Sequence, residues 1–208
     1  MINTYNESAL HENLKFIYAN LVNGTTEVKL KNFICDIVAD KHIYEIQTSN
    51  LSSLYKKINQ LINDYSFTII FPIAETCFIE WRTENNEFIS KRKSPKKENE
   101  YRIFKEITKL IPFIDNPNFQ IIILKADILE TRIKTENPIQ LKNNSRHRKK
   151  NWYKKDKNLL KINSKIILNS LDSYTVLAEK LLIDQCLSLK DLKNNKLCNK
   201  YAGYIIWS

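Results

Sequence analysis

The chain has 208 residues, 43% of them hydrophobic and 27% charged, which is enough apolar sequence to bury a core and excludes a wholly disordered protein. Only two glycines are present, Gly24 and Gly203, which excludes the glycine-rich phosphate loops of dinucleotide-binding and P-loop proteins and argues against a nucleotide cofactor. The net charge of +10 indicates a polyanionic partner.

The positive charge is concentrated in the later part of the chain. Residues 1–80 contain six Lys and Arg against nine Asp and Glu, whereas residues 81–208 contain 27 against 14. This asymmetry predicts nucleic acid as the partner. No apolar run approaches the roughly 18 residues of a membrane span, and the first residues lack the apolar part of a signal peptide, so we expect no membrane association. The four cysteines form no CxxC motif or Cys/His cluster, which favours reduced thiols in a cytoplasmic protein.

The first third of the chain predicts a helix, three strands, a second helix and a buried strand. Helical spacing of apolar residues, period-2 alternation and a continuous apolar run give these segments in chain order: helix 7–22, strands 27–30, 33–39 and 42–48, helix 51–64 and strand 67–73. Asn6 and Ser49-Asn50 can cap the two helices. The unbroken apolar run suits a parallel strand buried on both faces.

The remainder of the chain predicts less regular structure. In order, the patterns indicate a hairpin over 77–82 and 87–91, a basic loop over 91–97, a helix over 98–111, a strand over 119–125, a linker over 137–156 and helical structure from 157 to the end. Residues 188–208 have the length and rhythm of two helices around a short turn.

The hairpin over residues 34–47 carries two acidic residues within apolar strands. If Asp40-Lys41 forms a two-residue turn, Asp36 lies directly opposite Glu45, with Cβ atoms about 5 Å apart on one sheet face. Such carboxylates repel unless one is protonated or a divalent cation lies between them, and Mg²⁺ takes one or two carboxylates plus water and phosphate oxygens. The alternative to a metal site is an ordinary hairpin whose polar residues lie on its solvent-exposed face.

The order of these residues resembles the PD-(D/E)XK nuclease superfamily. The resemblance rests on Glu7-Ser-Ala-Leu-His-Glu-Asn-Leu-Lys15 in the first helix, Phe33-Ile-Cys-Asp-Ile-Val38 and Glu45-Ile-Gln47 in the strands, and Phe71-Pro-Ile after the second helix. More narrowly, the chain is similar to an uncharacterised bacterial family with a Glu-x-Gln variant and a C-terminal winged-helix-like part.

The resemblance implies an α/β fold with a restriction-endonuclease-like core, made of a helix, a three-strand antiparallel meander, a helix and a parallel strand. It implies a nuclease domain over 1–136, a basic linker over 137–156 and a small helical, helix-turn-helix-like domain over 157–208. Asp36 and Glu45 would hold Mg²⁺, with the backbone carbonyl of Ile46 as a third ligand. Glu7 would orient a water or complete the metal shell, and Glu12 is the alternative helix acid.

The function implied is Mg²⁺-dependent hydrolysis of DNA phosphodiester bonds, with DNA favoured over RNA. Gln47 occupies the position where the superfamily most often has lysine, and an amide can orient a water but adds no positive charge. This departure keeps open a non-catalytic nucleic-acid-binding or regulatory protein on a degenerate nuclease fold. A homodimer is compatible with either function.

Two basic segments are the candidate nucleic-acid contacts. Cations neutralise phosphates, and an aromatic such as Trp152 can stack on an exposed base or pack on a neighbouring domain. The candidate residues are Lys91, Arg92, Lys93, Lys96, Lys97, Arg146, Arg148, Lys149, Lys150, Trp152, Lys154 and Lys155. The C-terminal pair of helices predicts either a helix-turn-helix with residues 196–208 as its recognition helix or a pair that closes a small core.

Overall fold

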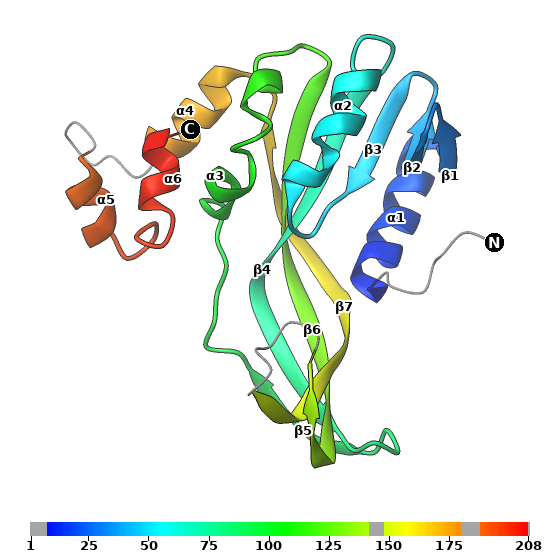
Figure 1. The fold of residues 1–208 in the computed structure, drawn as a ribbon, viewed down its shortest axis with the longest axis vertical. Coiled ribbons are helices and arrows are strands. Elements are labelled where there is room, and N and C mark those ends of the chain that lie inside the picture. Colours follow the sequence, from blue (N-terminus) through cyan, green and yellow to red (C-terminus); the bar gives the residue numbers. More distant parts are fainter. Residues whose placement is uncertain (1–7, 142–147, 180–187, 208) are drawn as a thin grey trace.

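The computed structural model describes residues 8–141, 148–179 and 188–207, which form a mixed α/β structure around one seven-stranded sheet (Figure 1). The strands are β1 (Thr25–Leu30), β2 (Phe33–Ala39), β3 (His42–Ile46), β4 (Ser66–Arg82), β5 (Phe88–Lys93), β6 (Phe119–Gln140) and β7 (Lys149–Leu168). The helices are α1 (Ala9–Val22), α2 (Tyr55–Leu61), α3 (Arg102–Glu106), α4 (Leu171–Glu179), α5 (Leu189–Asn194) and α6 (Ala202–Trp207), with 3-10 turns η1 (Leu51–Leu54) and η2 (Ile111–Phe113).

The sheet order is β1-β2-β3-β4-β6-β7, with β5 paired to β4 alone. Strands β1, β2 and β3 form an antiparallel meander, β3, β4 and β6 run parallel, and β7 returns antiparallel to β6. The predicted order of helix, three strands, helix and parallel strand is confirmed. The run from Phe67 to Ala74 is buried throughout, as expected for a strand covered by helices on both faces.

Two hydrophobic cores lie on opposite faces of the sheet. Leu10 and Leu14 of α1 pack against one face with Ile37 and Ile70. The other face packs against α2 and α3, and the same contiguous core includes buried residues of α4, α5 and α6, namely Tyr174, Leu177, Leu192, Ala202 and Ile205. The C-terminal helices therefore join the rest of the structure through this shared core, with α4 beside β7, α6 beside α3 and α5 beside α6.

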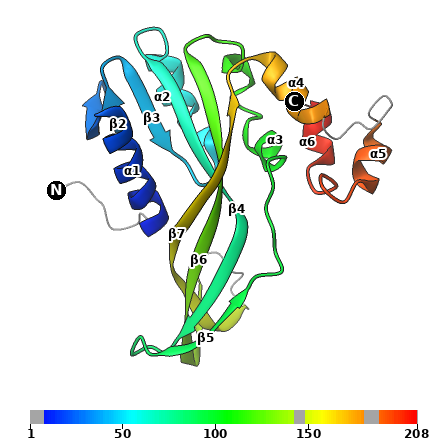
Figure 2. The same cartoon turned by 180° about the vertical axis from the view of Figure 1, so that it is seen from behind.

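The long strands β4, β6 and β7 continue beyond the helices and, together with β5, form a narrow extension that Figures 1 and 2 show from both sides. We call this part the arm and define it as residues 77–93, 128–140 and 149–158. Its strands lie in the order β5-β4-β6-β7, so β7 is an edge strand along its whole length.

The expected linker and the expected helix after it are wrong where the structure describes them. Residues 137–140 end β6, residues 149–156 begin β7, and residues 157–168 continue β7 rather than forming a helix. Leu159, Ile162 and Ile166 are three and four residues apart, as apolar residues on one face of a helix are. Pairing with β6 nevertheless makes this segment a strand. The expected boundaries at 136/137 and 156/157 therefore fall inside β6 and β7.

Several expected helix ends also differ. Ser8, not Asn6, caps α1, and its hydroxyl accepts the His11 N–H at 3.4 Å, while Asn6 lies outside the described residues. Asn50 stands at the start of η1 in a left-handed conformation without a side-chain capping bond. The helix expected over 98–111 is reduced to α3, and η2 begins only at its last residue.

The expected recognition helix over 196–208 is shorter than predicted. The Asn195 side chain accepts the Leu197 N–H at 2.9 Å, and this local bond favours a turn rather than a helix. Lys196, Asn199 and Lys200 consequently precede α6, which begins at Ala202.

Gly24 is required where the chain passes from α1 into β1. A Cβ atom on this residue would lie 2.5 Å from Ile37 Cγ2 and 3.2 Å from the Val38 carbonyl oxygen. Ile37 is fully buried and branched at Cβ, so it cannot move aside easily. We expect Gly24→Ala to destabilise the protein by about 1–3 kcal/mol, the usual cost of overpacking, in denaturant unfolding. Unchanged stability would show that Ile37 and the Val38 backbone move freely to make room for a side chain at position 24.

Candidate functional site

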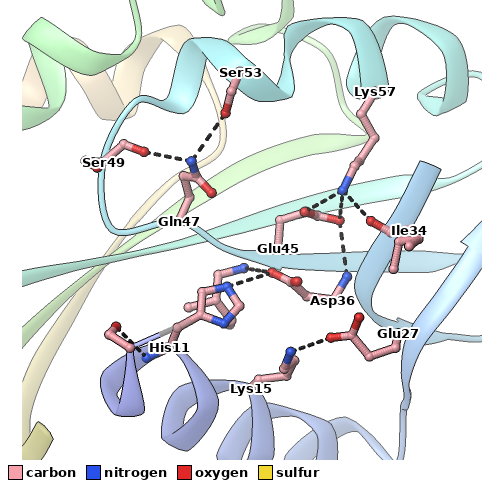
Figure 3. Close-up of polar contacts among 12 residues, drawn as sticks. His11, Lys15, Glu27, Ile34, Asp36, Glu45, Gln47, Ser49, Ser53 and Lys57 are labelled. Atoms are coloured by element: carbon pink, nitrogen blue, oxygen red, sulfur yellow. Dashed lines mark hydrogen bonds and ion pairs between the residues drawn. The ribbon is translucent and has the colours of Figure 1, made fainter. Parts of the chain in front are cut away.

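Asp36 and Glu45 lie on neighbouring strands, as the hairpin pattern predicts. The pairs Ala39↔His42, Val38↔Ile43 and Ile37↔Tyr44 confirm the two-residue turn and its register. Past the Ile37↔Tyr44 pair, carboxylate side chains accept the backbone hydrogen bonds between the two strands. Ile46 N–H donates to Asp36 Oδ2 at 2.8 Å, and Asp36 N–H donates to Glu45 Oε1 at 3.4 Å. The two carboxylates therefore hold the ends of β2 and β3 together and are fixed in position (Figure 3).

Asp36 points toward α1. Its Oδ2 lies 3.3 Å from His11 Nε2, and both side chains are 16% exposed. Burial alone would raise the pKa of Asp36, but the hydrogen bond and positive charge of His11, together with the Ile46 N–H, outweigh it and hold the pKa below its ordinary value. Asp36 is therefore an anion stabilised by its surroundings.

Glu45 points toward α2 and is almost fully buried, with 4% of its side chain exposed. Lys57 Nζ lies 2.8 Å from both carboxylate oxygens and also donates to the Ile34 carbonyl at 2.7 Å. Burial raises the pKa of Glu45 to about 7, with the charge of Asp36 adding to the rise and Lys57 opposing it. Burial therefore outweighs the attraction of Lys57 in setting the pKa of this carboxyl.

The sequence pattern does not predict Lys57 as a site residue, because a helix lysine is usually a solvated surface residue. Here only 13% of its side chain is exposed. One signal was available: Lys57 directly precedes Ile58, which is on the buried face of α2. The positive charge beside Glu45 therefore comes from α2, the helix that follows the hairpin.

Gln47 is turned away from the carboxylates. Its Nε2 donates to the Ser49 carbonyl at 2.7 Å and lies 3.3 Å from Ser53 Oγ, which holds the loop between β3 and η1 (Figure 3). Its amide thus supports the loop that leads into α2, the helix that carries Lys57.

The two candidate helix acids contribute differently from expectation. Glu7 lies outside the described residues, and the alternative, Glu12, is exposed on α1. On the same helix, His11 faces Asp36, and Lys15 pairs with Glu27 of β1. The helix residue that the structure brings to the carboxylates is therefore the histidine next to Glu12.

The donor set can be tested against a divalent cation. Within the described residues, no group of three His, Cys, Asp or Glu side chains is arranged to hold a metal ion. Asp36 and Glu45 nevertheless offer the hard oxygen donors that Mg²⁺ prefers. The oxygens of the two carboxylates are therefore candidate ligands for a Mg²⁺ ion whose shell is completed by water, although Lys57 contacts both oxygens of Glu45.

The basic candidates lie on or beside the arm. Lys91, Arg92 and Lys93 are on β5 and Lys96 and Lys97 follow it, while Lys149, Lys150, Trp152, Lys154 and Lys155 are on β7, directly after Arg148. Arg146 lies outside the described residues. Strands β5 and β7 form the two edges of the arm, so the sequence segments that looked like a loop and a linker belong to one extended element.

Comparisons with known proteins give a family without an assigned activity. A family model described as a domain of unknown function, DUF8091, matches residues 8–169. A Treponema pallidum (strain Nichols) protein named "Uncharacterized protein" is 32% identical over 121 residues, which are 58% of this chain and 48% of that protein. The chain thus spans about half the length of the curated relative it matches. No solved structure matches the chain. Among the described residues, no helix has the length and apolar character needed to cross a membrane.

Proposed function

The chain belongs to the DUF8091 family, and we propose that it is a Mg²⁺-dependent nuclease that hydrolyses DNA phosphodiester bonds on a restriction-endonuclease-like core. The observation that carries the proposal is the Asp36–Glu45 pair on neighbouring strands, backed by Lys57 and His11. Four ionisable side chains gathered between two hydrophobic cores, with pKa values of the two carboxylates shifted in opposite directions, are typical of functional sites.

Each residue has a role that follows from its contacts. Asp36 and Glu45 would hold the cation, and Ile46 N–H and His11 orient Asp36. A divalent cation held there supplies charge that stabilises a phosphodiester under attack and makes water a better nucleophile. Lys57 contacts both oxygens of Glu45 and, with its positive charge at the site, would offset charge on a bound phosphate, a role that the neutral amide of Gln47 cannot take.

The arm supports nucleic acid as the substrate. Its two edge strands carry the basic residues, and long-range attraction between such charges and phosphates provides binding without base recognition. Lys154 is partly neutralised by Glu130 at 3.2 Å, whereas Lys91, Arg92, Lys93 and Lys149 are on the exposed surface. The arm would therefore hold the polymer while the carboxylate pair acts on it.

The second candidate is a nucleic-acid-binding protein without catalysis. The observation in its favour is that Lys57 occupies both oxygens of Glu45, so the carboxylate has a counter-ion in the absence of a metal. In this reading, the ion pair ties α2 to the sheet and has only a structural role.

Metal-dependent melting and cleavage assays on the wild-type protein separate the two functions. If it is a nuclease, Mg²⁺ or Mn²⁺ should raise the melting temperature relative to EDTA, since binding to the native state alone stabilises it, and should permit DNA cleavage. Neither a shift nor cleavage of plasmid, linear duplex or single-stranded DNA, with DNA binding retained, would leave the binding protein as the function.

A further inference from the structure

The arm carries an open pocket remote from the carboxylate pair. It is lined by Trp81, Ile89, Ser90, Lys134, Asn151 and Trp152 and encloses about 370 Å³. Strand register brings these residues together: Ser90 of β5 pairs with Trp81 of β4, and Lys134 of β6 pairs with Trp152 of β7. All four strands of the arm therefore contribute to one hollow.

The pocket combines two aromatic rings with cations. The rings of Trp81 and Trp152 meet edge to face, with centroids 5.6 Å apart. Arg132 Cζ lies 4.3 Å from the Trp152 centroid and 5.5 Å from that of Trp81, and Lys150 Nζ lies 4.8 Å from the Trp152 centroid. Lys134 is exposed on the pocket lining. The surroundings are positively charged, although Glu130 pairs with Arg132 and Lys154.

Packing alone explains this arrangement poorly. Neither tryptophan belongs to either of the two hydrophobic cores, and both remain partly exposed. The two rings do not fill the space between the strands, because a hollow of about 370 Å³ remains beside them, large enough for a flat ring. The ligand that matches an aromatic wall with cations around it is a planar ring that carries a nearby negative charge, and a nucleotide has both.

We propose that the arm pocket binds an unpaired base of single-stranded nucleic acid, with Trp152 and Trp81 contacting the base and Lys134 and Lys150 contacting neighbouring phosphates. This inference rests on the proposed function and deepens it, because it names single-stranded regions as the part of the substrate that the arm holds. A base within an intact duplex is stacked on its neighbours and cannot enter the pocket.

The test is a binding titration in EDTA, so that the result does not depend on cleavage. A dT oligonucleotide should quench tryptophan fluorescence, since two of the three tryptophans line the pocket. Trp152→Ala should weaken binding to the oligonucleotide by about tenfold or more and binding to a duplex of equal length by less than about twofold. Trp152→Phe, which retains an aromatic ring, should bind more tightly than Trp152→Ala.

Lys134→Glu provides a second variant if Trp152→Ala unfolds, because its side chain is exposed. Lys165→Glu is the matched control: it is also an exposed strand lysine, but it pairs with Leu124 in the body of the sheet. Lys134→Glu should weaken oligonucleotide binding by more than the control. Base binding in the pocket would be contradicted by equal losses from the two lysine variants, or by equal losses of single-strand and duplex binding in the tryptophan variants. Neither result would contradict the proposed nuclease activity. Absence of all nucleic-acid binding at low salt would overturn the proposed function as well.

Discussion

Replacing Asp36 with Asn should reduce metal-dependent DNA cleavage by more than about 100-fold, since changes even to groups that only support metal ligands cost 10–100-fold. The amide oxygen can still accept the Ile46 N–H, but the negative charge that would hold the cation is lost. The rise in melting temperature on adding Mg²⁺ or Mn²⁺ should disappear together with the activity.

The same variant should be modestly less stable than the wild type at neutral pH without metal. A carboxylate whose pKa is lowered in the folded state contributes stability above its unfolded pKa and loses it as the pH falls through the lowered value. Repulsion between the two acids alone would predict a gain in stability on removing Asp36, but the contact with His11 reverses that sign.

Asp40→Asn is the matched control for this experiment. It makes the same chemical change in the same hairpin, at an exposed turn residue with φ of 51°, a conformation that Asn tolerates. Cleavage and the metal-induced shift should be unchanged in this variant. A catalytically competent Asp36→Asn protein would exclude Asp36 as a metal ligand.

The hairpin that positions the carboxylates could be predicted from the sequence, because the alternation and the turn that define it lie within a few neighbouring residues. Alternation over residues 33–46 and a two-residue turn predict the register, and the pairs from Ala39↔His42 to Ile37↔Tyr44 confirm it up to the residues next to Asp36 and Glu45. The expectation that both carboxylates share one sheet face is not confirmed: Asp36 contacts His11 of α1 and Glu45 contacts Lys57 of α2, and the buried residues of these helices belong to the cores on opposite faces. The hairpin pattern does not indicate this, because both partners come from elements outside the hairpin.

The arm was not predictable for a different reason. Strand β7 is an edge strand rich in lysine, so its alternation is weak, and only pairing with β6 identifies it as a strand. Trp81 and Trp152 are distant in sequence and meet only because β4, β6 and β7 continue past the helices. The clusters of lysine and arginine in the sequence indicate exposed segments, but the sequence does not show that these segments form one arm, because the arm depends on long-range strand pairing.

Replacing Lys57 with Met should destabilise the metal-free protein by about 3–5 kcal/mol at pH 8, the usual cost of leaving one member of a buried ion pair without its partner. Lys57 contacts both oxygens of Glu45, and both side chains are largely buried. Lys56→Met is the control, because this neighbouring lysine is exposed on the same helix and its loss should change stability little.

The loss caused by Lys57→Met should grow with pH. The pKa of Glu45 is raised in the folded protein to about 7 from an ordinary value of 4.5, so the folded state binds this proton more tightly than the unfolded state. Stability from such a group is fully present below the unfolded pKa and is lost as the pH rises through the folded value. Removing Lys57 raises the pKa of Glu45 further, so the variant should be closest to the wild type near pH 5. Adding Glu45→Gln should restore most of the stability at pH 8, because the uncompensated charge is then gone. Urea unfolding of the single and double variants in EDTA measures both effects, and a Lys57→Met protein as stable as the wild type at pH 8 would show that Glu45 does not need this counter-ion.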